Sequence, residues 1–573
     1  MNRSRRASIV RGGQVSKTSR QGIVYRDAVI GERLKATRRR LNRRSGGGER
    51  VNGVSYLSVM PFKRPVDLDD TLIRIGGFGR WQRVQWVIAS VSLVFFWASN
   101  FFFVIASYSN IDMKCDLHCK PNNSFSSGVE PGSCHEDHTY MKFTTVNEWN
   151  LICDDSWLRS IVQAAFFVGQ AIGLFLSYTI GEFIGPRKLL CLSSVVFVVC
   201  TCVSPYSVFY WIFVALRLGV GVTTGVAFGS IYTIAFDTSA SRFIPVLCCS
   251  LILARILAHY LLIGFAYVTQ SWNLVNLIIS APVFVLAALN IWLMPESPRW
   301  YLAKKKTADA ERILSKIARC NGYKPEHISI LVLGIEANVN DIKCSILDVF
   351  SDKGDLFKRF LTLSLANIFH AIAYYVLSFS PAFYHKLADW TLYWNLGLCG
   401  LLELVAMLAA VAISFFNVPR RCPTLTAAVA AGMLCMLGSA VCDSALATMV
   451  LMFSSKLLIT ISDVLLQVMT AEAFPRKMST GAFLVILSLA HLGAVAAPYL
   501  VISLEQDAMI PMLICGVSAV CASFAIFMAP ETIRKDDDST TSHKPYPVDL
   551  EMTDAGQPLI VQVQFSTAKP VYV

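Results

Sequence analysis

Long apolar stretches separated by short polar segments dominate this 573-residue sequence. A helix needs about 20 mostly apolar residues to cross a bilayer, and twelve stretches meet that criterion. The third is short, and the fourth and tenth carry more polar residues than the rest. Their approximate limits are 86–107, 159–180, 189–206, 209–231, 244–268, 274–294, 360–382, 392–416, 424–442, 447–470, 480–502 and 509–528. The pattern predicts an all-α membrane protein with 12 transmembrane helices.

Composition supports a bilayer as the solvent of most of the chain. Hydrophobic residues make up 54% of the sequence, charged residues 16%, and the mean hydropathy is +0.51. A soluble domain devotes about a quarter of its residues to charge. The net charge of +12 is confined to one segment, because residues 1–60 hold 15 Lys and Arg against three acids. The positive charge therefore belongs to a tail, and we expect no nucleic-acid partner.

Lysine and arginine are concentrated in alternate connections between the apolar stretches. Such an excess marks the cytosolic side of a membrane protein. The intervening short connections are poor in Lys and Arg. The basic connections carry Arg187–Lys188, Arg242, Lys304–Lys306, Arg420–Arg421 and Arg476–Lys477, and the amino-terminal tail and Arg534–Lys535 fall on the same side. With an even number of spans, this asymmetry predicts that both termini are cytosolic.

The basic amino-terminal tail is too polar to bury a core of its own, as "RRRLNRR" at Arg38–Arg44 illustrates. We expect residues 1–80 to be a largely disordered cytosolic tail. Attraction to anionic inner-leaflet lipid, worth about 1 kcal/mol per basic residue, is an added role. The acid-free, Arg- and Ser-rich first 26 residues are also typical of a mitochondrial transit peptide, and that alternative remains open.

One connection on the non-cytosolic side is long, at residues 108–156, and holds four cysteines. An even number in an oxidising location favours two disulfides, with three pairings possible, over four free thiols. The same loop carries a glycosylation sequon at Asn122. These features favour the plasma membrane over a mitochondrion. The cysteines are Cys115, Cys119, Cys134 and Cys153.

Features at the basic ends recur at nearly constant spacing, which predicts two six-helix pseudo-repeats. The pairs are Asp237 and Glu472, 235 residues apart; Pro295–Glu296 and Pro530–Glu531, also 235 apart; and Pro186–Lys188 and Pro419–Arg421, 233 apart. Parallel repeats of this kind build the major facilitator fold, with its substrate site between the halves. The expected parts are the tail 1–80, a first half 81–294, a cytosolic linker 295–357, a second half 358–529 and a tail 530–573.

The linker carries the pattern of one short amphipathic helix. Thr307 is a candidate helix cap, followed by acidic residues in the first turn. Ile313, Leu314 and Ile317 form an apolar stripe, and Asn321–Gly322 ends the pattern. We expect this helix to lie beneath the bundle on the cytosolic side.

Three motifs resemble the organic cation/anion transporters of solute carrier family 22. They are "NEWNLICDDSW" (Asn147–Trp157), "PESPRW" (Pro295–Trp300) and "AEAFP" (Ala471–Pro475). The likeness covers roughly residues 67–535 and implies the major facilitator fold and transport by alternating access. It also implies a set of gating or structural charges: Glu182, Arg217, Asp237, Glu296, Arg299 and Glu472. We expect Arg217 to join Asp237 and Glu296 on the cytosolic side.

The chain departs from the family pattern in two loops. "GEFIGPRK" (Gly181–Lys188) has Phe183 and Pro186 where family members have arginines, and "FFNVPRR" (Phe415–Arg421) has no acid. In the family, these contacts latch the cytosolic face. A non-transporting receptor or regulatory membrane protein therefore stays an alternative to a carrier.

Ionisable groups inside the spans are costly, and each is a functional candidate. At the place of His491, the family's cation carriers tend to have an acid and its anion carriers an arginine. This histidine either hydrogen-bonds between helices or bears on substrate charge. Glu403 matches an acid of the cation carriers, and Phe228 and Tyr374 match cavity aromatics. The candidate substrate-binding residues are Glu403, Asp463, His491, Tyr374, Phe228 and His370.

The charges inside the spans nearly balance, since Glu403 and Asp463 face Arg255 and Lys456. Lys456 lies seven residues before Asp463, so we expect the two to share a helix face and partly neutralise each other. A near-neutral cavity favours an organic cation or a zwitterion over an organic anion.

A sugar-type carrier of the same fold would need a cavity rich in Gln and Asn, of which spans seven and ten offer little beyond Asn367 and Gln467. The sequence has no phosphate-binding loop and no metal-ligand spacing. We therefore expect neither an enzyme nor a cofactor, and we make no prediction of oligomeric state.

Overall fold

The structure is a computed structural model that describes residues 68–107, 143–149, 151, 155–323, 328, 332, 349, 354–380, 392–415, 418–441, 444–504 and 509–531. Several expectations fall outside these residues: most of both tails, the four loop cysteines (Cys115, Cys119, Cys134 and Cys153) and the Asn122 sequon. The disulfides and the glycosylation therefore stay predictions.

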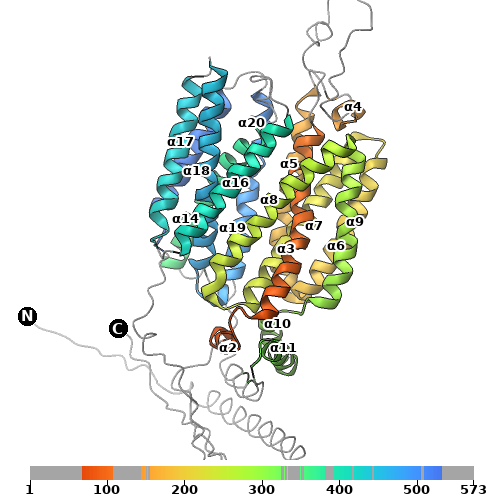
Figure 1. Cartoon of the computed structure of the whole chain (residues 1–573), viewed down its shortest axis with the longest axis vertical. Coiled ribbons are helices and arrows are strands. Elements are labelled where there is room, and N and C mark those ends of the chain that lie inside the picture. The colour runs from red at the N-terminus through yellow and green to blue at the C-terminus, as the bar shows by residue number, and fades with distance from the viewer. Residues whose placement is uncertain are drawn as a thin grey trace, which may run out of the picture. The chain divides into compact units, whose positions relative to one another are not determined.

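Twelve helices in the described residues are long and apolar enough to cross a membrane, which confirms the predicted fold class (Figure 1). The first six spans are α3 (Arg80–Ala106), α5 (Leu158–Ile184), α6 (Pro186–Val203, extended by the 3₁₀ turn Ser204–Tyr206), α7 (Tyr210–Thr238), α8 (Ile244–Thr269, preceded by the 3₁₀ turn Ser241–Phe243) and α9 (Trp272–Leu293). The second six are α14 (Asp355–Phe379), α16 (Leu392–Phe415), α17 (Arg421–Ala440), α18 (Ala445–Glu472), α19 (Arg476–Ala494) continued by α20 (Ala497–Ser503), and α21 (Met509–Met528).

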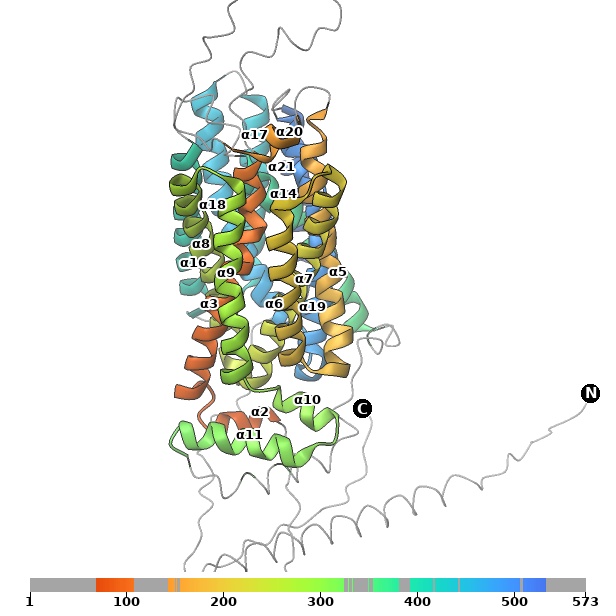
Figure 2. The ribbon, with the colours of Figure 1, turned by 90° about the vertical axis from the view of Figure 1, so that its right-hand side faces the viewer.

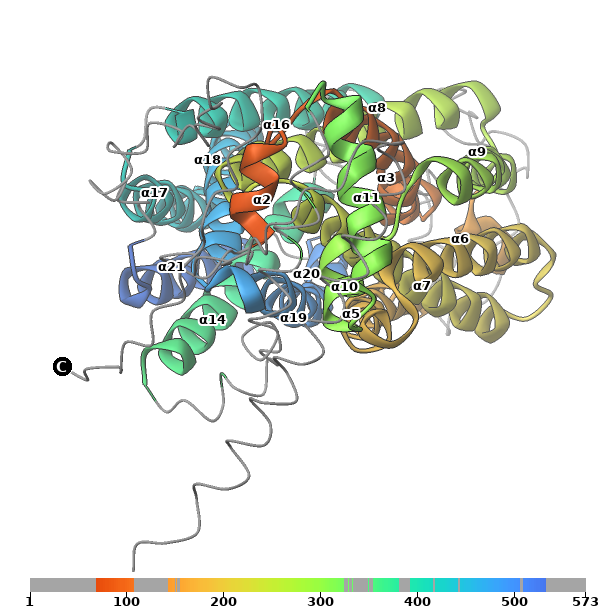
Figure 3. The same ribbon diagram turned by 90° about the horizontal axis from the view of Figure 1, so that it is seen from below.

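Two six-helix halves meet along a few helices. The helix α5 packs on α19 and α20, and α8 packs on α16 and α18. The hydroxyl of Ser488 on α19 donates to Ala171 O on α5 at 2.7 Å, and Ser160 on α5 donates to Pro498 O on α20 at 3.0 Å. Figure 3, which views the bundle along its helices, shows the two sets lying against each other. Hydroxyl-to-carbonyl bonds suit this interface because buried polar groups need partners in a membrane.

One end of the bundle, which we call the linker end, carries α2 (Leu68–Arg74), α10 (Pro298–Ala303) and α11 (Thr307–Cys320) (Figure 2). Leu72, Leu314 and Ile317 are buried in one apolar cluster there, which confirms the amphipathic linker helix. The Asn321 side chain accepts from Trp81 N at 3.0 Å and donates to Ile75 O at 2.8 Å. These bonds fix α11 to the start of α3.

Two details of the linker end differ from the sequence-based expectation. Lys306 is the residue before the first helical residue, so Thr307 begins α11 and does not cap it. Residues 68–80 contain α2 and the first residue of α3, with Leu68 and Leu72 buried. They belong to the folded bundle, and not to the disordered tail that we expected over residues 1–80. The local pattern missed α2 because its buried face is completed only by α11, which is distant in sequence.

The predicted repeat is visible in matching contacts at the linker end. In the first half, Glu296 Oε1 accepts the backbone N–H of Arg187 at 2.8 Å. In the second half, Glu531 Oε1 accepts the backbone N–H groups of Arg420 and Arg421 at 3.0 and 3.3 Å. In both, the carboxylate that follows the sixth span accepts N–H groups at the start of the third span, where the helix dipole favours an anion.

At the opposite end, which we call the loop end, the short helix α4 (Thr145–Trp149) packs on the first half. The Trp149 ring stacks on Phe213 with centroids 4.6 Å apart. Glu148 Oε2 accepts from the Trp272 indole N–H at 2.8 Å. The Glu-Trp pair of the "NEWNLIC" motif therefore ties the long loop to the ends of α7 and α9.

Glycines set the closest helix contact of the first half. A Cβ added to Gly173 on α5 would lie 2.0 Å from Val222 O on α7, and one added to Gly221 on α7 would lie 2.2 Å from Phe166 O. We expect Gly173→Ala to lower stability by at least about 1–3 kcal/mol, the usual cost of overpacking, because the two backbones must separate. Thermal unfolding of the detergent-solubilised protein measures this.

Gly264→Ala on α8 is the matched control, because a Cβ there meets nothing within 4 Å. It should be neutral or slightly stabilising, since alanine favours helix. Equal stability of the two variants would contradict the close α5–α7 contact.

Candidate functional site

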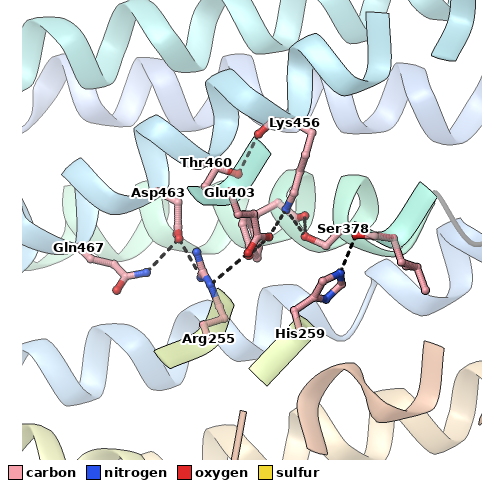
Figure 4. A network of polar contacts seen from close by, with 10 residues as sticks. Arg255, His259, Ser378, Glu403, Lys456, Thr460, Asp463 and Gln467 are labelled. Carbon is pink, nitrogen blue, oxygen red and sulfur yellow. Dashed lines mark hydrogen bonds and ion pairs between the residues drawn. The ribbon is translucent and has the colours of Figure 1, made fainter. Parts of the chain in front are cut away.

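Four charged side chains meet between the two halves (Figure 4). Arg255 comes from α8 in the first half; Glu403, Lys456 and Asp463 come from α16 and α18 in the second. Arg255, Glu403 and Lys456 are 3%, 3% and 1% exposed, and the Asp463 side chain is 14% exposed. We call these four residues the charged quartet. Two cations and two anions leave it formally neutral.

Arg255 carries the ionic contact between the halves. Its Nη1 lies 3.1 Å from Asp463 Oδ2, and its Nε lies 3.9 Å from Glu403 Oε2. Gln467, one turn after Asp463, donates its amide to the same Oδ2 at 3.1 Å. The guanidinium carbon lies 4.6 Å from the centre of the Tyr374 ring. A charge placed this deep needs such partners, because burying an unpaired ion costs several kcal/mol.

Glu403 is held by two donors from the second half itself. Its Oε1 lies 2.7 Å from Lys456 Nζ and accepts from the Tyr374 hydroxyl, also at 2.7 Å. Lys456 Nζ also donates to Ser378 Oγ at 2.6 Å and lies 3.9 Å from the centre of the Tyr374 ring. Tyr374 and Ser378 are four residues apart on α14, so one helix face supports the pair.

The expected neutralisation of Asp463 by Lys456 is wrong. The two residues do share a face of α18, but each pairs with a residue of another helix: Asp463 with Arg255, and Lys456 with Glu403. Seven residues correspond to a rise of about 10 Å, which is too far for a direct contact. Only the packing of α8 and α16 against α18 decides the partners.

Part of the quartet has no hydrogen-bond partner. Arg255 Nε and Nη2 and Glu403 Oε2 are buried and unpaired within the described residues. The 3.9 Å between Arg255 Nε and Glu403 Oε2 exceeds hydrogen-bond distance. A buried donor and a buried acceptor of opposite charge therefore face one another beyond hydrogen-bond distance.

Aromatic rings from both halves border the quartet. Trp97 on α3 lies 5.7 Å from the Arg255 guanidinium and 4.4 Å, between ring centroids, from Phe228. Phe228 is fully buried behind Trp97. Phe228 therefore packs behind another ring, and Trp97, which we did not select from sequence, occupies the place nearer the charges.

The remaining selected residues lie on α14 and α19. His491 Nδ1 donates to Leu487 O of its own helix at 2.8 Å, and its Nε2 has no hydrogen-bond partner in the described residues. Of the two alternatives for this histidine, the bond between helices is therefore not seen there. Its ring lies 6.3 and 6.4 Å from those of Tyr375 and Phe167. His370 is buried one turn before Tyr374, and neither of its ring nitrogens has a hydrogen-bond partner in the described residues.

Polar groups of the first half continue the site towards the loop end. Asn100 Nδ2 donates to Gln170 Oε1 at 3.2 Å, and Gln163 Nε2 donates to Asn100 O at 3.1 Å. His259 Nε2 on α8 donates to Leu396 O on α16 at 3.0 Å, across the halves. The three amides escaped the sequence analysis, because neutral amides at membrane depth carry little signal by themselves, whereas His259 is one of the ionisable groups inside the spans.

Most expected gating charges gather at the linker end. Asp237 accepts from Arg299 Nε at 3.1 Å through Oδ1 and from Ser297 Oγ at 2.7 Å through Oδ2. In the second half, Arg420 pairs with Glu472. Four of the six expected charges therefore lie at the linker end: Asp237, Glu296, Arg299 and Glu472.

An arginine that we had not selected joins the halves at this end. Arg476, the first residue of α19, donates through Nη2 to Phe236 O and, at 3.0 Å, to Ser239 O at the end of α7. A cation at the carboxyl end of a helix is favoured by its dipole.

Two expected gating residues lie elsewhere. Arg217 is seven residues into α7, near the loop end, where its guanidinium donates to Ser99 O at 3.2 Å and lies 4.8 Å from the centre of the Phe166 ring. It is separated from Asp237 by most of α7, so the predicted network of the two is wrong. Glu182 is exposed at the linker end, and only its backbone oxygen makes a described contact, accepting from Trp300 Nε1 at 3.0 Å.

Comparison with known proteins gives a consistent picture. The family model described as "Sugar (and other) transporter" matches residues 85–538. The chain is 27% identical to the organic cation/carnitine transporter 4 of Arabidopsis thaliana, over 84% of this chain and 92% of that protein. It is 25% identical to a Drosophila melanogaster beta-alanine transporter, over 70% of this chain and 66% of that protein. It is 27% identical to mouse solute carrier family 22 member 4, over 72% of this chain and 76% of that protein.

Among solved structures, the major facilitator proton:xylose symporter XylE superposes with a TM-score of 0.59 at 16% identity. The match covers 79% of this chain and 96% of XylE. This likeness concerns the fold alone.

Burial at the linker end raises the pKa of Glu296, although the N–H bond from Arg187 opposes this shift. A raised pKa means that stability is lost as pH rises from the ordinary glutamate value of about 4.3 through the raised one. Glutamine keeps an acceptor for Arg187 without the charge. We expect Glu296→Gln to match the wild type below that window and to exceed its thermal stability above it.

Glu182→Gln, exposed at the same end, is the control and should show no such trend. Thermal unfolding of both variants across a pH series makes the measurement. A Glu296→Gln difference that does not change with pH would refute the assignment.

The Lys456–Glu403 pair predicts strong coupling in a double-mutant cycle. Lys456→Met leaves a buried carboxylate with less compensation, at a cost of about 3–5 kcal/mol. Adding Glu403→Gln should recover most of that loss, because the uncompensated charge is then gone. Additive effects of the two substitutions on thermal stability would show that the pair does not form.

Proposed function

Because the chain belongs to the sugar (and other) transporter family and has a major facilitator fold of 12 spans, we propose that it carries small organic cations or zwitterions across a membrane. Alternating access moves the substrate: the halves rock about a site between them. The charged quartet and its aromatic border are that site. Transport is facilitative or coupled to an existing gradient.

The unpaired atoms of the charged quartet carry this proposal. A zwitterion has a cationic group that can bind Glu403 Oε2 and a carboxylate that can accept from Arg255 Nε and Nη2, which have no other partner in the described residues. The neutral sum of the quartet disfavours a substrate with a large net charge, because the site would then hold an unbalanced charge in a medium of low dielectric. The rings of Tyr374 and Trp97 add cation–π attraction of about 0.5–2 kcal/mol for the cationic group.

The relatives support the same class of substrate. Two of them are named for carnitine and for beta-alanine, and each compound joins a cationic nitrogen to a carboxylate. Simple organic cations are the next best fit, since Glu403 and Asp463 outnumber the cations of the site whenever Arg255 turns away.

We place the linker end in the cytosol and the protein in the plasma membrane. The basic residues that begin α6, α17 and α19 all lie at the linker end, with Lys304–Lys306 beside them. An excess of basic residues is typical of the cytosolic side. Alternation then breaks the Arg476 contacts to open the cytosolic side, or the Ser160–Pro498 contact to open the other.

Uptake into cells expressing the full chain tests the proposal. The labelled compounds are carnitine and beta-alanine as zwitterions, tetraethylammonium as a cation and a dicarboxylate as an anion. We expect zwitterion uptake by the wild type, and its loss in Glu403→Gln. Arg255→Gln should lower apparent zwitterion affinity by about tenfold, equivalent to about 1.4 kcal/mol, while raising cation uptake, because two carboxylates then face one lysine.

Asp309→Asn, on α11 at the linker end, is the control and should transport like the wild type. Surface labelling corrects for abundance. Absence of accumulation of every compound by surface-located protein would refute the carrier and favour a transporter-like receptor. Cation uptake unchanged in Glu403→Gln would refute the proposed substrate site.

A further inference from the structure

Two cysteine thiols lie against each other inside the second half. Cys435 on α17 and Cys515 on α21 have their sulfur atoms 3.7 Å apart, and each residue is 1% exposed. Both are free cysteines. They belong neither to the charged quartet nor to the linker-end contacts.

A close crossing of α17 and α21 produces this pair. A Cβ added to Gly432 or to Gly516 would lie 2.9 Å from the backbone oxygen of the other. Cys435 lies three residues after Gly432, and Cys515 directly precedes Gly516. A disulfide requires Cα atoms within about 4.4–6.8 Å, a range that helices reach only where small residues let their backbones touch.

The thiols also contact residues next to the charged quartet. The Ser455 hydroxyl donates its hydrogen to Ala431 O. In the 3.0 Å contact between Cys435 Sγ and Ser455 Oγ, the Cys435 thiol is therefore the donor. The Cys515 thiol donates to Ala373 O at 3.7 Å. Ser455 precedes Lys456, and Ala373 precedes Tyr374. The sulfur pair therefore lies directly behind two partners of Glu403.

We propose that Cys435 and Cys515 form an oxidisable dithiol whose disulfide lowers transport through the charged quartet. The oxidant is a small membrane-permeable peroxide. One sulfur attacks a peroxide oxygen, the O–O bond breaks, and water and a sulfenic acid form. The second sulfur displaces the sulfenic oxygen as another water. Overall, two thiols and one hydrogen peroxide give one disulfide and two waters.

Disulfide formation changes the contacts behind the quartet. An S–S bond of about 2.05 Å brings the sulfurs more than an ångström closer than in the dithiol. Both S–H donors disappear, so Ser455 Oγ and Ala373 O lose their bonds from sulfur. The neighbouring Lys456 and Tyr374 must then shift relative to Glu403. This effect on uptake rests on the proposed transport function, whereas formation of the disulfide does not.

The first experiment measures the disulfide itself. Membranes containing the full chain are treated with hydrogen peroxide, free thiols are alkylated, and mass spectrometry of the digested protein identifies linked peptides. We expect a Cys435–Cys515 linkage that a dithiol reductant removes, with the loss of two alkylatable thiols. Cys435→Ser and Cys515→Ala should each abolish it. Absence of this linkage in the wild type would overturn the proposal.

The second experiment measures uptake of carnitine before and after peroxide. We expect a several-fold fall in the wild type, restored by reduction, and no fall in Cys435→Ser or Cys515→Ala. Cys248→Ser, a buried cysteine of the first half, is the control and should remain sensitive. A linkage that forms without changing uptake, or sensitivity that persists in both single variants, would overturn the regulatory effect.

The two readouts separate the proposals. If surface-located protein accumulates none of the compounds tested, the transport function fails, but the linkage measurement still decides whether the dithiol is oxidisable.

Discussion

Burying charge in a membrane requires compensation, and the charged quartet is where this constraint shapes the protein. Arg255 of the first half pairs with Asp463 and lies near Glu403 in the second half. Lys456 is the closer counterion of Glu403. Removing any one member leaves a buried ion with less compensation. The proposed substrate site therefore coincides with a contact between the halves, so a ligand bound to Arg255 or Glu403 would change what holds α8 to α16 and α18.

The two ends of the bundle solve a different problem, which is to hold and release a contact between rigid halves. At the linker end, Arg476 of the second half donates to Phe236 O and Ser239 O of the first. Within each half, the carboxylate that follows the sixth span accepts the N–H groups that begin the third. Towards the loop end, the described contacts between halves include single hydrogen bonds to backbone carbonyls, from Ser160 to Pro498 O and from His259 to Leu396 O. Contacts of this small size are compatible with a conformational change. Close glycine-mediated crossings hold each half together, α5 with α7 in the first and α17 with α21 in the second.

The fold was largely predictable from one sequence, because membrane spans follow from length and hydropathy alone. All twelve predicted spans exist, and the 235-residue spacing of Asp237 with Glu472 and of Glu296 with Glu531 corresponds to equivalent positions in space. Helix ends were less predictable: α3 begins at Arg80 rather than near 86, and α2 was missed. At these places, contacts with the distant linker helix decide where helix begins.

The candidate site was also predictable only in part. The sequence by itself determined which residues were costly enough to matter: Glu403, Asp463, Arg255 and Lys456 stand out because an ionisable group in lipid needs a reason. Only the tertiary structure decided who pairs with whom. It separated Lys456 from Asp463, removed Arg217 from the linker end, set Phe228 behind Trp97 and brought Cys435 to Cys515. The reason is physical: periodicity along one helix fixes a shared face, but a partner on another helix depends on which backbones approach closely, and glycines and small polar residues set that distance.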